Sequence, residues 1–196
     1  MSRRPALDTL AQVEIDSPQA LRDWLDMHHR QAASVWIVTY RKPDPRHVPW
    51  GAIVDAALCF GWIDSLPRRL DDARTMVLLS PRRPGSAWSA VNKAKVAALT
   101  AAGLLAPAGL AAVAAAKESG TWNRLDAAHA LVVPPDLEAA LAAHPGAADH
   151  FASFSPSSRR GILEWIEQAR RPQTRTSRVE TTARLAAENR KANHPG

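Results

Sequence analysis

Apolar side chains recur at intervals of three and four residues after Ser17, and this spacing predicts an amphipathic helix. Ser17 suits the N-cap of that helix, and Pro18 suits its first turn, where a proline costs no hydrogen bond. The residues that share the predicted apolar face are Leu21, Trp24, Leu25 and His28. Similar spacing predicts a second helix over about 49–60, and Gly61 ends it.

Three short runs of residues predict strands. The first is 34–40 (SVWIVTY), which is β-branched and aromatic, and the others are 62–70 and 75–80 (TMVLLS), joined through Asp71 and Asp72. Short strands that follow one another closely along a chain pair in antiparallel fashion. We therefore expect a small three-stranded antiparallel sheet packed with helices.

A long uncharged run covers residues 96–116 and approaches the length that crosses a membrane. Eleven of these residues are alanine, which is only weakly apolar, and Gly103 and Pro107 interrupt the run. Two consecutive helices of a soluble protein fit better, the first capped by Ser86 or Ser89 and the second beginning at Pro107. We therefore predict no membrane span.

The last third of the chain is also helical in pattern. Residues 132–135 (VVPP) indicate a linker, and prolines mark the helix starts that follow it. These prolines are Pro135, Pro145, Pro156 and Pro172. The sequence therefore predicts an α+β fold that is mainly α, with a body over residues 1–131 and a small helical C-terminal domain over residues 132–196.

The single cysteine, Cys59, excludes a disulfide within the chain and favours a reducing compartment. No apolar run follows the N-terminal arginines, so we predict no signal peptide and expect a cytoplasmic location. Cys59 lies between Leu58 and Phe60 with no histidine in a recognisable motif, which favours a buried, inert thiol over a nucleophile. The chain has neither zinc-ligand spacing nor a phosphate-binding glycine loop, and we predict no metal and no cofactor.

The central segment, residues 59–92, is dense in tryptophan, arginine and aspartate. Arginine forks bind carboxylates or phosphates in a bidentate way, indoles exclude water, and the start of a helix near Ser86 favours an anion. The candidate ligand-binding residues are Trp62, Arg68, Asp71, Arg82, Arg83, Ser86, Trp88, Ser89 and Asn92. Asp64 is the candidate general base because it follows an apolar run. The segment predicts a pocket for a small anionic or aromatic ligand.

The same segment also fits a purely structural role. Its arginines can pair with Asp64, Asp71 and Asp72 in an ion-pair network, with the tryptophans as core residues. Ion-pair networks and functional sites draw on the same residue types, so the residues alone leave both interpretations open.

Positive charge is concentrated near the C-terminal end of the chain. Residues 159–191 carry eight arginines and one lysine against four glutamates, which accounts for +5 of the net charge of +6. A candidate basic patch comprises Arg171, Arg175 and Arg178. Only Trp165 is aromatic in this stretch, so a base-stacking surface for nucleic acid is disfavoured, and a solvated face or an acidic partner fits better.

Four segments together resemble the YdeI/OmpD-associated family of bacteriocin-protection proteins. They are ALCFGWIDSLPRRLDD, SPRRPGSAWSAVNKAK, AGLLAPAGLAAVAAAK with ESGTW, and ARRPQTRTSRVE, so the resemblance extends from about Trp24 to Leu185. It implies that the helical end from about Pro135 is the small C-terminal domain of that family, and it implies no catalytic residues. The chain departs from the family at residues 65–67 and 105–106, where it is more apolar.

Three functions follow as hypotheses. The first is binding of a small anionic or aromatic ligand by the central segment, with catalysis left open. The second is a bacteriocin-protection or stress-tolerance factor that acts through a protein or peptide partner. The third is weak binding of nucleic acid through the basic helices, which the high isoelectric point of about 10.2 suggests.

Overall fold

The computed structural model describes residues 7–193, and the protein is an α+β protein that is about 51% helical. Its contacts divide the chain into two units. Unit 1 runs to Ser86 and continues over Val91–Ser119, whereas unit 2 comprises Ala87–Ala90 and the chain from Gly120 onward. Each unit has its own hydrophobic core and is described separately.

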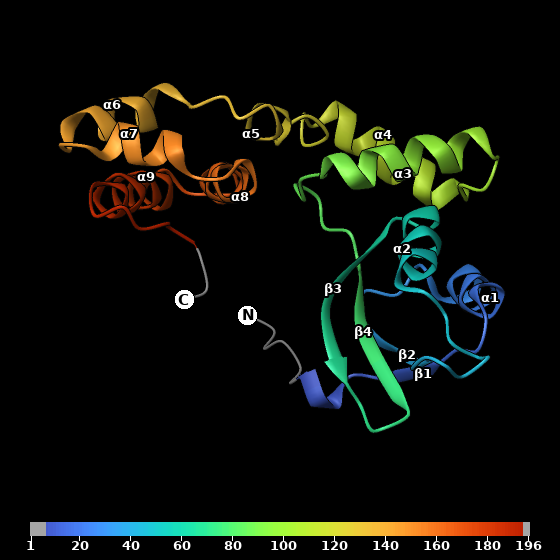
Figure 1. Ribbon diagram of the computed structural model, residues 1–196. Coiled ribbons are helices and arrows are strands. Elements are labelled where there is room, and N and C mark those ends of the chain that lie inside the picture. Colours follow the sequence, from blue (N-terminus) through green and yellow to red (C-terminus); the bar gives the residue numbers. More distant parts are fainter. Residues whose placement is uncertain (1–6, 194–196) are drawn as a thin grey trace. The chain divides into compact units, whose positions relative to one another are not determined.

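A four-stranded mixed sheet lies at the centre of unit 1 (Figure 1). Its order is β1 (Gln12–Glu14), β2 (Val35–Tyr40), β4 (Arg74–Pro81) and β3 (Trp62–Arg69). The three predicted strands are confirmed, and both of their pairings are antiparallel. The prediction of a purely antiparallel three-stranded sheet is wrong, because β1 adds a parallel edge next to β2. Its three residues are too few to show an alternating pattern.

Strand β4 has apolar side chains on both faces of the sheet. Met76 and Leu78 share one face with Trp36 and Val38 of β2. The intervening Val77 and Leu79 point to the other face, where α1 (Pro18–His28) and α2 (Trp50–Cys59) lie (Figure 1). We call the first the open face and the second the helical face.

The helices predicted for unit 1 are present, and a side chain caps the first of them. Ser17 caps α1 by accepting a hydrogen bond from the Ala20 N–H at 3.2 Å. The uncharged run forms two helices, α3 (Ala90–Ala101) and α4 (Pro107–Glu118), separated by Gly103 in the left-handed conformation. Among the described residues, no helix is long and apolar enough to cross a membrane.

The end of α2 approaches the start of α4 very closely. The Ala106 N–H donates to the carbonyl oxygen of Cys59 at 3.0 Å, so the chain entering α4 caps the last turn of α2. A Cβ atom on Gly109 would lie only 2.3 Å from that same oxygen. Glycine is therefore required at position 109 by the backbone of a neighbouring helix.

Unit 2 is helical throughout its described part (Figure 1). Its helices are α5 (Asp126–His129), α6 (Pro135–Ala143), α7 (Ala147–Ser153), α8 (Pro156–Glu167) and α9 (Pro172–Ala187). The predicted starts at Pro135, Pro156 and Pro172 are confirmed, whereas α7 begins two residues after Pro145 behind a left-handed Gly146. Side chains from all five helices form one core.

We predict that Gly109→Ala lowers the free energy of unfolding of unit 1 by about 1–3 kcal/mol, because overpacking displaces the α2 backbone. The measurement is urea denaturation followed by tryptophan fluorescence. The matched control is Gly51→Ala in α2, whose added Cβ would meet nothing closer than Lys95 Nζ at 4.0 Å. Equal stability of the two variants would contradict the close approach.

Candidate functional site

The alternation of β3 sends successive side chains to opposite faces of the sheet. Trp62 and Asp64 point to the helical face, whereas Ile63 and Ser65 point to the open face. Trp62 is 1% exposed, packs edge-on against Trp24 of α1, and donates its indole N–H to the carbonyl oxygen of His29 at 3.0 Å. This tryptophan is therefore part of the core of unit 1.

Asp64 accepts a hydrogen bond from an indole on the helical face, and its charge acts on a buried guanidinium. The Trp50 indole N–H donates to its carboxylate at 3.0 Å, and Trp50 belongs to α2. Burial lowers the pKa of the Arg82 guanidinium to about 10, and the charge of Asp64 acts in the opposite direction. Arg82 therefore stays cationic at neutral pH.

Arg68 and Asp71 lie near the hairpin that joins β3 to β4. Arg68 forms an ion pair with Asp8. Asp71 accepts two hydrogen bonds from the Arg74 guanidinium, at 2.9 and 2.7 Å, and two more from the backbone N–H groups of residues 73 and 74. Arg74 holds the pKa of Asp71 below its ordinary value. These contacts agree with the structural interpretation of the segment, in which its arginines and aspartates form ion pairs.

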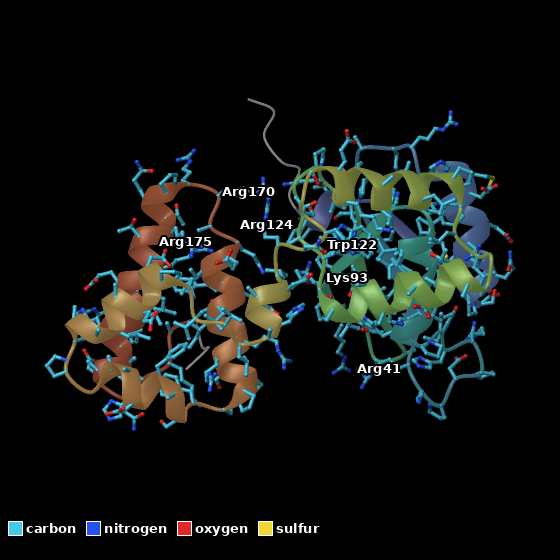
Figure 2. All side chains as sticks on the ribbon, turned by 90° about the horizontal axis from the view of Figure 1, so that it is seen from above. Arg41, Lys93, Trp122, Arg124, Arg170 and Arg175 are labelled. Carbon is cyan, nitrogen blue, oxygen red and sulfur yellow. The ribbon has the colours of Figure 1, made fainter. Side chains whose placement is uncertain are left out.

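The remaining predicted aromatic residue, Trp88, belongs to unit 2. It is 2% exposed, and its ring centroid lies 5.0 Å from that of Trp122, which Figure 2 labels. Ser89 belongs to the same short segment, and Asn92 lies in α3 of unit 1. Within unit 1, Trp62 and Asp64 lie on the helical face of the sheet, whereas Arg68 and Asp71 lie near the hairpin between β3 and β4.

Two of the predicted residues, Arg83 and Ser86, do line a cavity. It has a volume of about 600 Å³, and we call it the sheet pocket. Every lining residue belongs to unit 1. The lining residues are Leu7, Leu10, Ala32, Ala33, Ser34, Ile63, Ser65, Leu78, Ser80, Pro81, Arg83 and Ser86.

Serine hydroxyls supply most of the polar lining of the sheet pocket. The Oγ atoms of Ser34 and Ser80 lie 2.7 Å apart in a hydrogen bond between the start of β2 and the end of β4. The Ser65 hydroxyl donates to the carbonyl oxygen of Leu78 at 3.3 Å. The hydroxyls are thus held in place by strands of the sheet.

Arg83 supplies the one cationic side chain among the described residues of this lining. Among the described residues, it forms no ion pair, and no aspartate or glutamate lines the pocket. Its carbonyl oxygen accepts from the Ser86 N–H at 3.0 Å, so a turn brings these two residues to the same wall. The pocket therefore has an uncompensated positive charge beside hydroxyl donors.

A short 3-10 turn, η1 (Leu7–Thr9), borders the sheet pocket on the open face. The Trp36 indole N–H donates to the carbonyl oxygen of Leu7 at 2.8 Å, and the ion pair between Asp8 and Arg68 holds the other side of the turn. Leu10 packs against the apolar cluster around Trp36. Contacts with the sheet thus fix this apolar wall.

Sequence reasoning missed most of the pocket. The missed polar residues are Ser34, Ser65 and Ser80, and the missed apolar residues include Leu10, Ile63 and Leu78. The available signal was the period of two in the predicted strands, because residues 63 and 65 share one face, as do 78 and 80. The residue types instead drew attention to Trp62 and Asp64, which lie on the helical face.

The three arginines of the candidate basic patch in unit 2 have different surroundings. Arg175 donates to Asp136 of α6 at 2.6 and 3.0 Å and to Glu167 of α8 at 2.8 Å. Arg178 donates to the carbonyl oxygen of Trp165, and its guanidinium lies 4.9 Å from the Trp165 ring centroid. Arg171 is exposed. Figure 2 shows Arg170 on the loop before α9 and Arg175 within that helix.

The described residues contain no group of three or more histidine, cysteine, aspartate or glutamate side chains that could hold a metal ion. Cys59 is buried at the end of α2.

Comparison with known families divides the chain into two regions. Residues 13–112, just over half of the chain, match a family model described as a domain of unknown function, DUF8412. The chain belongs to this family. Residues 130–189 match a second model, described as Bacteriocin-protection, YdeI or OmpD-Associated. The resemblance to the YdeI/OmpD-associated family is thus confirmed over these residues. No curated protein and no solved structure matches the chain.

We predict that Arg175→Met lowers the thermal stability of unit 2 at pH 7 and that this loss shrinks in acid. Arg175 holds the pKa of Asp136 below its ordinary value of about 3.9. A lowered folded-state pKa contributes stability above the ordinary value, and that contribution is lost as pH falls through the folded-state value. Helix unfolding followed by circular dichroism at pH 7 and pH 3 measures both effects.

The control for this experiment is Arg170→Met, because Arg170 is exposed and forms no ion pair among the described residues. A loss for Arg175→Met that is as large at pH 3 as at pH 7 would show that the ion pairs do not cause it.

Proposed function

We propose that unit 1 binds a small ligand with an anionic end and an apolar body in the sheet pocket. The pocket's volume of about 600 Å³ lies within the range of about 300–1,000 Å³ that is usual for ligand pockets. Its lining is apolar with a few polar groups, which is also usual for such sites.

The observation that carries the proposal is the position of Arg83. Its exposed guanidinium borders a pocket whose described lining contains no carboxylate, so the site attracts an anion rather than a cation. Arg83 forms no ion pair among residues 7–193, and its guanidinium offers a planar fork of donors to a carboxylate or phosphate.

The proposal concerns binding and assigns no catalytic step. Asp64, the candidate general base, points to the helical face and is held by Trp50, whereas the sheet pocket opens on the other face. A ligand in the sheet pocket would therefore lie across the sheet from this carboxylate. Arg83 and Ser86 are the predicted residues that the proposal keeps.

We expect a small anionic, partly apolar compound to raise the melting temperature of the protein in a thermal-shift screen. Binding at a hundredfold excess over Kd stabilises the folded state by about 2.7 kcal/mol. The shift should disappear in Ala32→Phe, which places a large side chain at an exposed lining position, and should fall in Arg83→Ala.

The control for the screen is Arg41→Ala. Arg41, labelled in Figure 2, is an arginine of unit 1 that is not among the residues that line the pocket. A ligand shift that survives Ala32→Phe unchanged would place the binding site elsewhere and refute the proposal.

A second candidate function rests on the family match over residues 130–189. That family's description names bacteriocin protection, and we propose that residues 132–196 form a separate helical domain that meets a protein or peptide partner. Arg170 and Arg171 are exposed side by side before α9 and form no ion pair among the described residues. They offer an acidic partner a more accessible charge than Arg175 does.

We expect the double variant Arg170→Glu, Arg171→Glu to abolish protection of cells exposed to a bacteriocin, because it reverses the accessible charge without removing the ion pairs of Arg175. Cell survival is the measurement, and Arg41→Glu is the matched charge reversal in unit 1. Full protection by the double variant would contradict this second function.

A further inference from the structure

We infer that the ligand of the sheet pocket is an aliphatic monocarboxylate, with its carboxylate at Arg83 and its hydrocarbon chain against the wall formed by Leu7, Leu10 and Leu78. This inference rests on the proposed function and narrows it to one ligand class. Three properties of the lining lead to it: its charge, its hydroxyl donors and its lack of aromatic rings.

The first property is the number of charges. Among the described lining residues, Arg83 is the one formal cation, and no acidic side chain offsets it. A phosphate monoester carries a charge of about −1.5 to −2 at neutral pH, so one guanidinium would leave part of that charge uncompensated. A carboxylate carries one negative charge and matches one guanidinium in a bidentate pair.

The second property is the set of hydroxyl donors in the lining that contains Arg83. Arg83 and Ser86 both line the pocket, and the Ser86 N–H donates to the Arg83 carbonyl oxygen and closes the turn that carries them. In the Ser34–Ser80 pair, one hydroxyl donates to the other, and the accepting hydroxyl keeps its own proton. The lining thus contains hydroxyl donors in addition to the guanidinium, and a carboxylate has two oxygens to accept from them.

The third property is the character of the apolar lining. It consists of aliphatic side chains and Pro81, and no aromatic ring lies among its described members. An aromatic ligand would therefore find no ring to stack on, whereas a flexible hydrocarbon chain needs only apolar contact. Leu7 is 44% exposed, so a chain lying against it would remove apolar surface from water.

The apolar wall is already built before any ligand arrives. Trp36 and Arg68 fix the turn η1 on the sheet through Leu7 and Asp8. The pocket is consequently preorganised, and binding does not have to order this segment.

Calorimetric titration with octanoate, octanol and octyl phosphate separates these features, because the three probes share a chain and differ in head group. We expect octanoate to bind about tenfold or more tightly than octanol, the usual range for one charge-assisted hydrogen-bonding pair. Octyl phosphate should bind more weakly than octanoate. Arg83→Gln should reduce octanoate to the affinity of octanol, whereas Arg41→Gln should change nothing.

Other results would overturn either the monocarboxylate inference or the proposed function. If octyl phosphate binds as tightly as octanoate, or if Arg83→Gln leaves octanoate unaffected, the monocarboxylate inference is overturned while the pocket remains a ligand site. If none of the three probes binds and a metabolite screen gives no shift that Ala32→Phe removes, the proposed function itself fails.

Discussion

The architecture of unit 1 depends on β4, which is hydrogen-bonded on both sides and apolar on both faces. A strand in this position needs cover on each face, since its side chains alternate between them. Helices α1 and α2 cover one face, whereas the other is bordered by the turn η1 and contains the sheet pocket. Within the described part of unit 1, the pocket thus lies on the face of β4 opposite to α1 and α2.

The same alternation separates structure from candidate function in β3. Trp62 and Asp64 serve the core and the helical face, and their neighbours Ile63 and Ser65 line the pocket. The tryptophan and the aspartate, which the sequence suggested as functional residues, therefore make contacts within the protein. The residues proposed to meet a ligand are small hydroxyls, aliphatic side chains and one arginine.

In unit 2, the number of arginines in a segment of the chain differs from the number whose charge is accessible to a partner. Residues 159–191 have a large excess of arginine, but Arg175 binds two carboxylates and Arg178 packs on Trp165. Sequence counts charges along the chain, whereas helix packing decides which of them face a partner. Residues 130–189 of this unit match the family model described as Bacteriocin-protection, YdeI or OmpD-Associated.

The sequence by itself determined the elements that local chemistry controls. The Ser17 cap, the prolines that begin α4, α6, α8 and α9, and the β-branched run of β2 specify their elements through backbone sterics and nearby hydrogen bonds. Tertiary structure alone decided that Gln12–Glu14 joins the sheet and that Gly109 meets Cys59. It also decided that Ser34, Ser80 and Arg83 share a cavity. These features depend on pairs of residues far apart along the chain, and their contacts form only when the chain folds.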